Sequence, residues 1–340
     1  MTAATTPAAT ALIQPATLAG LPLSSQFVMA PMTREHSPGG VPTAANAAYY
    51  RRRAENGVGL IITEGVLIDH PSAGHQAGVP RLTEGAAEAG WRHVTSEVHA
   101  AGGRIAAQLW HLGSRREPVD GYPSWTPQTM TGRDFDTIIS SYAASARTAV
   151  RAGFDALEVH AAHGYLLDEF LWPVSNPTRR HRDFPAEVVR AIRAEIPSCM
   201  PLIVRFSQFK ERDYSARIAE TPHELATILE GLRAAGADVL HASQRRFWEP
   251  VFDGSDRNLA GWAKHLTGLP SITVGSIGLT RDFASSPRMR ELLERRARGE
   301  YDLIALGRVL LGNPAWVTLA GAGRLDEIRD YDKTDEDQYR

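Results

Sequence analysis

The amino-acid sequence predicts an α/β protein that folds as a single (β/α)8 TIM barrel. Short apolar runs alternate with amphipathic stretches along the 340 residues, and this alternation repeats eight times. A β-then-α repeat over this length is typical of a closed barrel, the alternative being an open doubly wound sheet. No linker or low-complexity tract interrupts the pattern. We therefore expect residues 1–340 to form one domain, with residues 1–10 flexible and residues 321–340 as a C-terminal tail.

The predicted strands are brief, continuously apolar and closed by a polar residue or glycine, as expected for strands buried on both faces of a parallel sheet. In chain order they are FVMA (27–30), GLIITEG (59–65), RIAAQLW (104–110), DALEVH (155–160), LIVRFS (202–207), ADVLHAS (237–243), SITVGS (271–276) and YDLIALG (301–307).

The predicted helices are amphipathic stretches between these runs. They cover residues 45–57, 84–103, 134–153, 185–196, 221–236, 258–268 and 286–299. Thr221, Pro222 and Glu224 have the pattern of an N-cap, a first-turn proline and a first-turn acid. Gly57 lies where a C-cap glycine is common.

Composition favours small-molecule chemistry. The formal net charge is -2 and no block of like charge stands out, so we expect no nucleic-acid or anionic membrane partner. The single cysteine, Cys199, excludes a disulfide framework and a four-thiolate metal or iron–sulfur site. Without a signal peptide or an apolar run of membrane-spanning length, the chain is expected to be soluble and cytoplasmic. Composition leaves homo-oligomerisation open.

The function of such a barrel lies at the carboxyl ends of its strands. The last two runs bring Gly275, Ser276, Gly307 and Arg308 to this rim, where glycine backbone and a fixed charge are suited to phosphate. The simpler interpretation is that the glycines only permit tight turns. Arg205 ends another apolar run; its permanent charge must face a carboxylate such as Glu64 or Glu158, water, or an anionic cofactor.

The stretch EVHAAHGYLLDEFL (158–171) allows three interpretations. His160 and His163 could bind a metal with Glu158 or Asp168, although no further histidine or cysteine ligand follows nearby. Tyr165 could act as a proton donor, because a phenol stays protonated at neutral pH. Alternatively, the histidines bond only to loop backbone. Spacing alone favours this last interpretation and gives the metal least support.

Seven motifs together resemble the Old Yellow Enzyme family of FMN-dependent ene-reductases. They occur in family order from about residue 11 to residue 320: VMAPMTR (28–34), LIITEG (60–65), QLWHLG (108–113), EVHAAHGYLLDEFL (158–171), VRFS (204–207), VGSIG (274–278) and LIALGR (303–308). Each motif alone is weak, but the ordered set is specific.

The resemblance implies a noncovalently bound FMN and NAD(P)H as reductant. Thr33 would hydrogen-bond near flavin O4 and N5, Gly65 would let the ring approach the backbone, and Gln108 would pair with the pyrimidine edge. Arg205 would lie near N1, where reduced flavin carries negative charge. The cofactor-binding residues implied are Ala30, Pro31, Met32, Thr33, Gly65, Gln108, Arg205, Gly275, Ser276, Gly307 and Arg308.

The resemblance also implies the chemistry. His160 and His163 match the pair that hydrogen-bonds the carbonyl oxygen of an α,β-unsaturated substrate, so that its β-carbon accepts hydride from flavin N5. Tyr165 matches the residue that protonates the α-carbon. The expected activity is therefore reduction of activated C=C bonds in unsaturated carbonyl or nitro compounds. Alternatives are a metal-dependent barrel lyase using Glu64, Glu158 and the two histidines, or a flavin-binding protein without turnover.

Three features depart from the family pattern. The segment after the tyrosine lacks the Tyr-Gly-Gly element, and Glu35 stands where some relatives have an aromatic lid residue. The loop at 244–256 places Arg245, Arg246 and Trp248 where they could reach substrate and favour anionic or aromatic groups. Trp110 is also expected to contact substrate. Surface arginines over a packed aromatic pair are the alternative. We expect no metal ligand set. The physiological substrate, the NADH or NADPH preference and the stereochemistry are unreadable from sequence.

Overall fold

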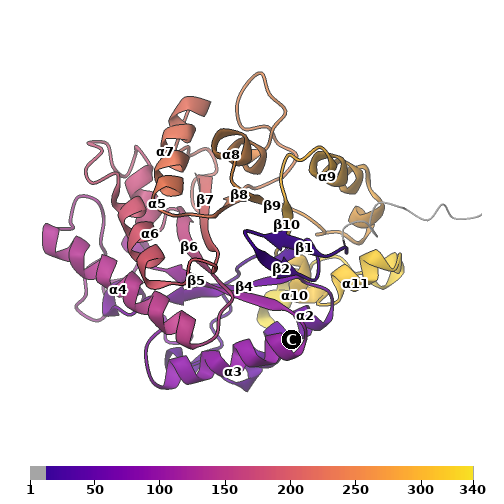
Figure 1. The fold of residues 1–340 in the computed structure, drawn as a ribbon, viewed down its shortest axis with the longest axis horizontal. Helices are drawn as coiled ribbons and strands as arrows, with labels where there is room; N and C mark the ends of the chain where they lie inside the picture. Colours follow the sequence, from indigo (N-terminus) through magenta and orange to yellow (C-terminus); the bar gives the residue numbers. More distant parts are fainter. Residues whose placement is uncertain (1–12, 340) are drawn as a thin grey trace, which may run out of the picture.

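A closed barrel of eight parallel strands forms the centre of the protein, as predicted (Figure 1). The computed structural model describes residues 13–339, so the predicted flexibility of residues 1–10 lies outside the described part. Neighbouring strands pair in chain order, and the last strand pairs with the first. The barrel strands are β3 (Phe27–Met29), β4 (Leu60–Leu67), β5 (Arg104–Trp110), β6 (Ala156–His163), β7 (Leu202–Lys210), β8 (Val239–Ser243), β9 (Ser271–Val274) and β10 (Leu303–Leu306).

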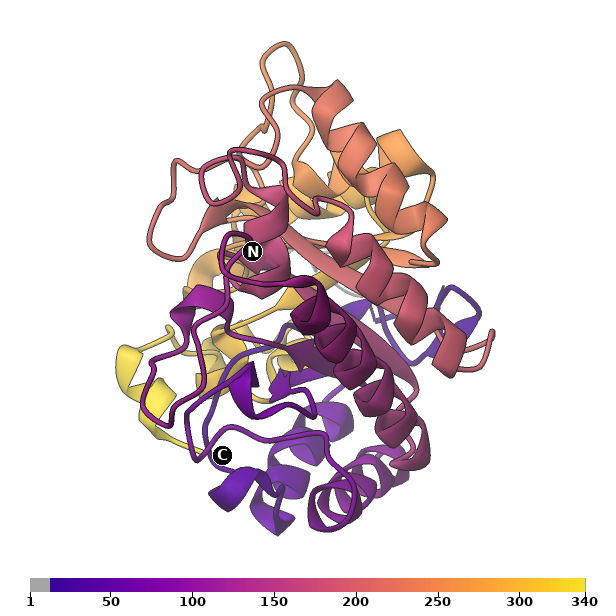
Figure 2. The ribbon, with the colours of Figure 1, turned by 90° about the vertical axis from the view of Figure 1, so that its left-hand side faces the viewer.

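Helices surround the barrel, and every predicted helix is present. Figure 2 shows α4 and α6, which contact each other, lying obliquely side by side. Thr221 is the N-cap, as predicted, and it forms a capping box with Glu224, while Gly57 follows the end of its helix with a φ of 85°. The helices are α2 (Ala44–Glu55), α3 (Ala86–Ala100), α4 (Gly132–Arg151), α5 (Leu166–Leu171), α6 (Phe184–Glu195), α7 (Pro222–Ala234), α8 (Leu259–Thr267), α9 (Pro287–Ala297), α10 (Val309–Gly312) and α11 (Trp316–Gly321).

A small hairpin closes the N-terminal end of the barrel. Its antiparallel strands are β1 (Ala16–Leu18) and β2 (Leu21–Leu23). Leu18 and Leu23 are buried in the apolar cluster that fills the barrel interior, together with Val28 and Leu60. This hairpin was not predicted, because strands of three residues carry almost no periodic signal. With this end plugged by apolar side chains, the opposite rim is left for chemistry.

Three strands run further than predicted and carry functional residues with them. β4 continues to Leu67, β6 to His163 and β7 to Lys210. The pairing register shifts between Ile62 and Gly65 and again between Ala161 and His163. Such irregularities at a barrel rim redirect side chains. Both histidines therefore lie on β6 itself and not in the loop after it.

The predicted C-terminal tail packs against the loop that follows β3. The Tyr339 ring stacks on Tyr49 and on His36, with ring centroids 4.5 Å and 4.1 Å apart. Arg34 Nη2 donates to the Gln338 carbonyl at 2.8 Å. These contacts hold Gln338 and Tyr339 beside the end of the predicted flavin segment.

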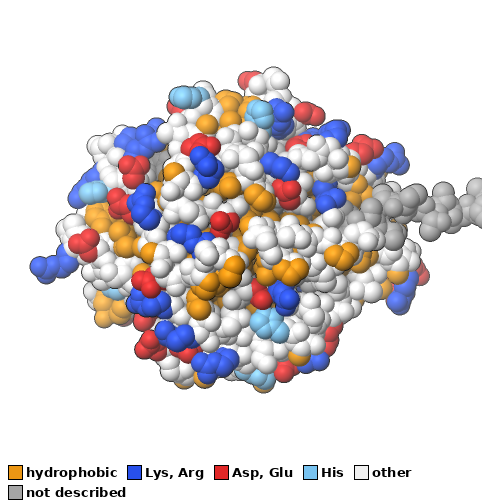
Figure 3. Space-filling view, viewed as in Figure 1, with side chains coloured by type: hydrophobic (Ala, Val, Ile, Leu, Met, Phe, Trp, Pro, Cys, Tyr) orange, Lys and Arg blue, Asp and Glu red, His pale blue; other side chains and the backbone are white. Residues whose placement is uncertain are grey.

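On the face in Figure 3, acidic and basic side chains are interspersed, without a large block of one sign. Over residues 13–339, no helix has the length and apolar character required to cross a bilayer.

Candidate active site

A pocket of about 490 Å³ opens at the carboxyl ends of five barrel strands, β3 and β7 to β10. Eight of the eleven predicted cofactor residues line it: Ala30, Pro31, Met32, Arg205, Gly275, Ser276, Gly307 and Arg308. Phe209, Tyr214, Ser243, Arg245 and Arg246 share the same wall. The tertiary fold thus brings together residues that the sequence separates by almost 280 positions.

The remaining three predicted cofactor residues lie outside this pocket wall. Thr33 is exposed in the loop after β3. Gly65 lies against Trp110, and a Cβ there would come within 2.5 Å of the indole ring. Gln108 is buried and donates to Glu158 Oε1 at 2.7 Å.

Arg205 presents a guanidinium to the pocket, and no carboxylate of residues 13–339 lies within ion-pair distance of it. The expected alternative partners are occupied elsewhere, since Glu158 pairs with His241 at 2.6 Å and Glu64 accepts the backbone N–H groups of Arg34 and Glu35. Arg205 Nη2 donates to Ser243 Oγ at 3.4 Å, and its Nε has no partner among residues 13–339. Burial lowers the pKa of Arg205, but a guanidinium remains charged. An anionic ligand edge would satisfy it.

Two glycines, Gly275 and Gly307, shape the part of the pocket formed after β9 and β10. A Cβ on Gly275 would lie 2.7 Å from the Gln244 carbonyl oxygen, so only glycine lets the loops after β8 and β9 meet there. Gly307 has open space, with Met32 Sδ 4.0 Å from its would-be Cβ. Arg308 lies 5.1 Å from the centre of the Tyr331 ring. These features fit the phosphate predicted for this end.

The two histidines and the tyrosine form one ring cluster. The His160 centroid is 4.9 Å from that of Tyr165 and 5.2 Å from that of His163. Trp110 packs edge-on against Tyr165 at 4.9 Å, so its indole walls the cluster. His163 Nε2 lies 2.8 Å from Ser243 Oγ, which ties the cluster to the pocket wall.

Both imidazoles are neutral at physiological pH. Burial, and next the positive charge of Arg205, place the pKa values of His160 and His163 well below the ordinary histidine value. His160 Nδ1 accepts the Ala162 N–H at 3.3 Å, so the proton of this ring lies on Nε2. His160 can therefore donate a hydrogen bond from Nε2.

A left-handed turn ends β6 and sets the position of Tyr165. His163 and Gly164 have φ values of 66° and 85°, a conformation that is easy for glycine and strained for histidine. Ser207 Oγ accepts the His163 N–H at 3.0 Å, and Asp168 Oδ2 accepts the Gly164 N–H at 2.7 Å. These bonds hold the strained turn.

A buried ion pair supports this turn. Lys210 Nζ lies 2.6 Å from Asp168 Oδ2, and both side chains are excluded from solvent. Asp168 was considered from sequence only as a metal ligand, and Lys210 was not predicted. The available signal was a lysine three residues beyond the predicted apolar run, but its partner is 42 positions away.

Tyr165 is held as a neutral phenol. Burial, and next the charge of Glu211, raise its pKa above the ordinary tyrosine value. Its hydroxyl donates to Glu211 Oε2 at 3.3 Å, and Arg115 Nη1 lies 3.8 Å from the same oxygen. Glu211 follows β7 and was not predicted, because its loop carries no motif.

The other residues predicted to contact substrate do not all lie at the pocket. Arg245 and Arg246 line the pocket beside Gly275 and Ser276. Trp248 does not line it; its ring packs edge-on against Phe247 and lies beneath the Arg288 guanidinium at 4.5 Å. Glu35 is exposed, with a φ of 58°.

No arrangement suited to a metal accompanies the histidines. Across the described part of the chain, no group of three or more histidine, cysteine, aspartate or glutamate side chains is placed to hold an ion. Burial raises the pKa of Glu64 to about 7. The two glutamates of the lyase hypothesis thus serve structural hydrogen bonds.

Comparison with known proteins gives consistent matches over most of the chain. Residues 11–327 match the family described as NADH:flavin oxidoreductase / NADH oxidase. The NADH oxidase of Thermoanaerobacter brockii is 30% identical over 343 residues, covering 92% of this chain and 51% of the relative, so the chain spans about half of its length. The NADPH dehydrogenase of Clostridium acetobutylicum is 31% identical over 324 residues, covering 88% and 91%.

Solved structures have the same architecture. Morphinone reductase in complex with tetrahydroNAD superposes with a TM-score of 0.80 at 25% identity, covering 96% of this chain and 93% of that one. Old Yellow Enzyme from Pichia sp. AKU4542 gives a TM-score of 0.80 at 23% identity, covering 96% and 89%, which supports the fold alone.

Proposed function

The chain belongs to the NADH:flavin oxidoreductase / NADH oxidase family, which includes Old Yellow Enzyme, and we propose that it is an FMN-dependent ene-reductase. Its substrates would be α,β-unsaturated carbonyl or nitro compounds, whose activated C=C bond is reduced at the expense of NAD(P)H. Family membership gives the chain FMN as its cofactor and NAD(P)H as its reductant. The observation that carries the proposal is the neutral His160–His163 pair beside a protonated Tyr165, at the wall of the Arg205 pocket.

The pocket residues suit FMN at both ends. The unpartnered Arg205 would face the electron-rich edge of the flavin ring, and the Gly275–Ser276 and Gly307–Arg308 pairs would hold its phosphate. Ala30, Pro31 and Met32 provide the side wall between these ends. When bound between these residues, FMN would supply the hydride-transfer chemistry that links NAD(P)H to the alkene.

The histidines act on the substrate carbonyl or nitro oxygen. Negative charge grows on this oxygen during reduction, and fixed N–H donors stabilise it most when water is excluded. His160 provides the Nε2–H, and Ser243 holds the His163 ring at the site. Because both rings are neutral, they stabilise the developing charge without giving up a proton.

Tyr165 provides the proton for the α-carbon. Its raised pKa keeps the hydroxyl protonated, and the edge-on contact with Trp110 fixes the plane of the ring. Glu211 orients the hydroxyl in the absence of substrate. The strained turn at His163 and Gly164 determines the distance between the carbonyl donors and this acid.

The test separates the two half-reactions. Anaerobic NADH or NADPH should bleach the flavin absorbance, and a panel of enones, maleimides and nitroalkenes should restore it. If the nicotinamide reduces the flavin but no activated alkene reoxidises it, the chain is a flavin reductase of another kind and the proposal is wrong. A panel of both nicotinamides also resolves the coenzyme preference.

A further inference from the structure

The segment after β8 packs directly on the loop predicted to bind phosphate. The Phe247 N–H donates to the Gly275 carbonyl at 3.2 Å, and Ser276 Oγ donates to the Arg245 carbonyl at 2.8 Å. The Arg245 backbone is thereby fixed beside Ser276. Its side chain starts at the phosphate end of the pocket, which it lines.

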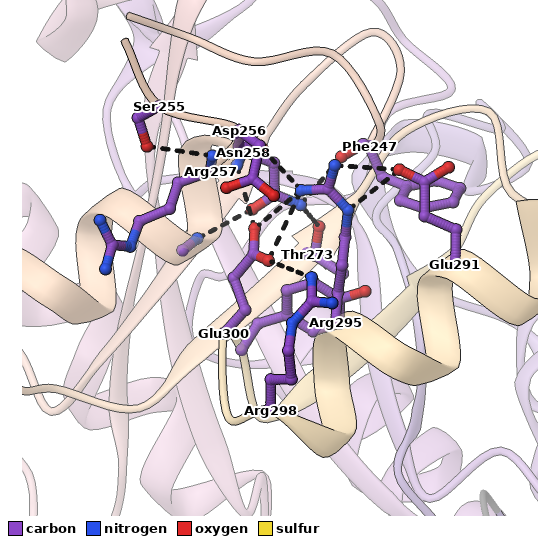
Figure 4. A network of polar contacts seen from close by, with 12 residues as sticks. Phe247, Ser255, Asp256, Arg257, Asn258, Thr273, Glu291, Arg295, Arg298 and Glu300 are labelled. Atoms are coloured by element: carbon purple, nitrogen blue, oxygen red, sulfur yellow. Dashed lines mark hydrogen bonds and ion pairs between the residues drawn. The ribbon is translucent and has the colours of Figure 1, made fainter.

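A network of polar contacts holds the far end of the same loop (Figure 4). Asn258 Nδ2 donates to the Phe247 carbonyl at 3.0 Å and to Thr273 Oγ1 at 3.1 Å. Arg295 Nη1 donates to the Asp256 carbonyl at 2.7 Å and to Glu300 Oε1 at 3.1 Å. Because both ends of the loop are fixed, Arg245 keeps its position at the pocket.

The arginines at this end differ in their charge partners. Arg246 pairs with Glu249 at 2.7 Å. Within residues 13–339, neither Arg245 nor Arg308 has a carboxylate within the 4.0 Å of an ion pair. Each lies over a tyrosine ring instead: Arg245 over Tyr214 at 4.5 Å and Arg308 over Tyr331 at 5.1 Å. Two uncompensated guanidiniums in one pocket match the charge of a phosphate dianion.

We propose that Arg245 is a second phosphate-binding arginine for FMN, acting with Arg308 and positioned by Tyr214. The assignment moves Arg245 from the predicted substrate role to the cofactor. It rests on FMN as the cofactor and not on the proposed reduction of enones. The competing role is binding of an anionic substrate, because a neighbouring chamber of about 310 Å³ shares Arg245 and Tyr214 with the main pocket.

The assignment can be tested without turnover, by measuring the binding of flavins to the apoprotein of the full chain. FMN and riboflavin differ only by the phosphate, and quenching of flavin fluorescence gives a dissociation constant for each. Arg245→Ala should weaken FMN by roughly ten- to a hundredfold, as expected for loss of a charge-assisted hydrogen bond. Its effect on riboflavin should stay within about twofold, because riboflavin lacks the anion. Arg308→Ala should behave in the same way.

Arg246→Ala is the matched control, since Arg246 lines the same pocket but is already paired with Glu249. It should change FMN affinity much less than Arg245→Ala. Tyr214→Ala should weaken FMN less than Arg245→Ala, because it removes only the support of the guanidinium. Equal losses of FMN and riboflavin affinity in Arg245→Ala would show a structural role and overturn the assignment. Unchanged FMN affinity with a raised KM for acidic enones would also overturn it, in favour of substrate binding.

Discussion

His163 Nε2 lies 2.8 Å from Ser243 Oγ, and this contact joins the ends of β6 and β8 across the intervening β7. The same oxygen accepts from Arg205 Nη2 at 3.4 Å. Ser243 is therefore the point at which the proposed flavin contact and the proposed carbonyl donor meet. Neither β8 nor its serine belongs to any motif that indicated the function.

Ser243→Ala should impair enone reduction. It removes the partner that holds the His163 ring and the hydroxyl that accepts from Arg205 Nη2. Loss of one buried hydrogen bond predicts a roughly tenfold slower reoxidation of the flavin by an enone. Stopped-flow absorbance measures this rate. Ser215→Ala, an exposed serine in the neighbouring loop, serves as control. A rate equal to that of the wild type would mean that Ser243 does not position His163.

Tyr165→Phe should separate the half-reactions. Loss of a general acid predicts a reoxidation rate by enones lower by roughly a hundredfold or more. The reduction of the flavin by NAD(P)H needs no proton from this phenol and should stay within about twofold of the wild type. Tyr214→Phe, which keeps the ring over Arg245, is the matched control. Equal losses in both half-reactions would assign Tyr165 a structural role only.

Asp168→Asn should destabilise the fold. The substitution leaves the buried Lys210 ammonium without its counter-charge. Removal of one partner of a buried ion pair is expected to lower the free energy of unfolding by about 3 kcal/mol. Urea denaturation followed by circular dichroism measures it. The control is Glu327→Gln, which breaks the solvent-exposed pair with Arg324 and should leave stability unchanged. A similar result for both variants would show that the buried pair contributes nothing.

Stability should depend on the protonation of Glu64. Burial raises the pKa of this carboxyl to about 7, whereas an unfolded chain has a glutamate pKa near 4.5. Between these pH values the folded state binds more protons than the unfolded state. The contribution of Glu64 to the free energy of unfolding is therefore full at low pH and is lost as the pH rises. Each group of this kind contributes up to about 1.4 kcal/mol per pH unit. Burial also raises the pKa of Glu169 to about 7, with the same sign.

Glu64→Gln tests this dependence because the amide resembles the protonated acid. Its oxygen can still accept the N–H groups of Arg34 and Glu35. Between pH 5 and 7, the free energy of unfolding of this variant should fall less steeply than that of the wild type. Glu169→Gln should reduce the slope in the same assay in the same way. A pH profile identical to that of the wild type would show that Glu64 ionises normally.

Much of the fold follows from local pattern. Alternating apolar runs and amphipathic stretches predicted eight strands and their helices, since the period of side-chain burial is a property of short segments. The boundaries were less accurate at β6 and β7, where register shifts extend the strands beyond their apolar runs. The β1–β2 hairpin was missed because its strands are too short to show a period.

The candidate site was predicted in part. The rim motifs at His160, Tyr165, Arg205 and Gly275 could be read from sequence, because a parallel barrel collects the carboxyl ends of its strands at one edge. The contacts that position these side chains could not be predicted from the sequence. Glu211 and Lys210 lie in segments without a motif, and their partners Tyr165 and Asp168 lie more than forty positions away.

The sequence by itself determined the barrel and the family, because these depend on local periodicity and on motifs that keep their order along the chain. Only the tertiary structure decided which charges are already paired. Glu158 hydrogen-bonds to His241, whereas within residues 13–339 Arg205 and Arg245 line the pocket without a carboxylate at ion-pair distance. Which of these groups lack a partner depends on strand register and loop packing between distant segments, which no local pattern records.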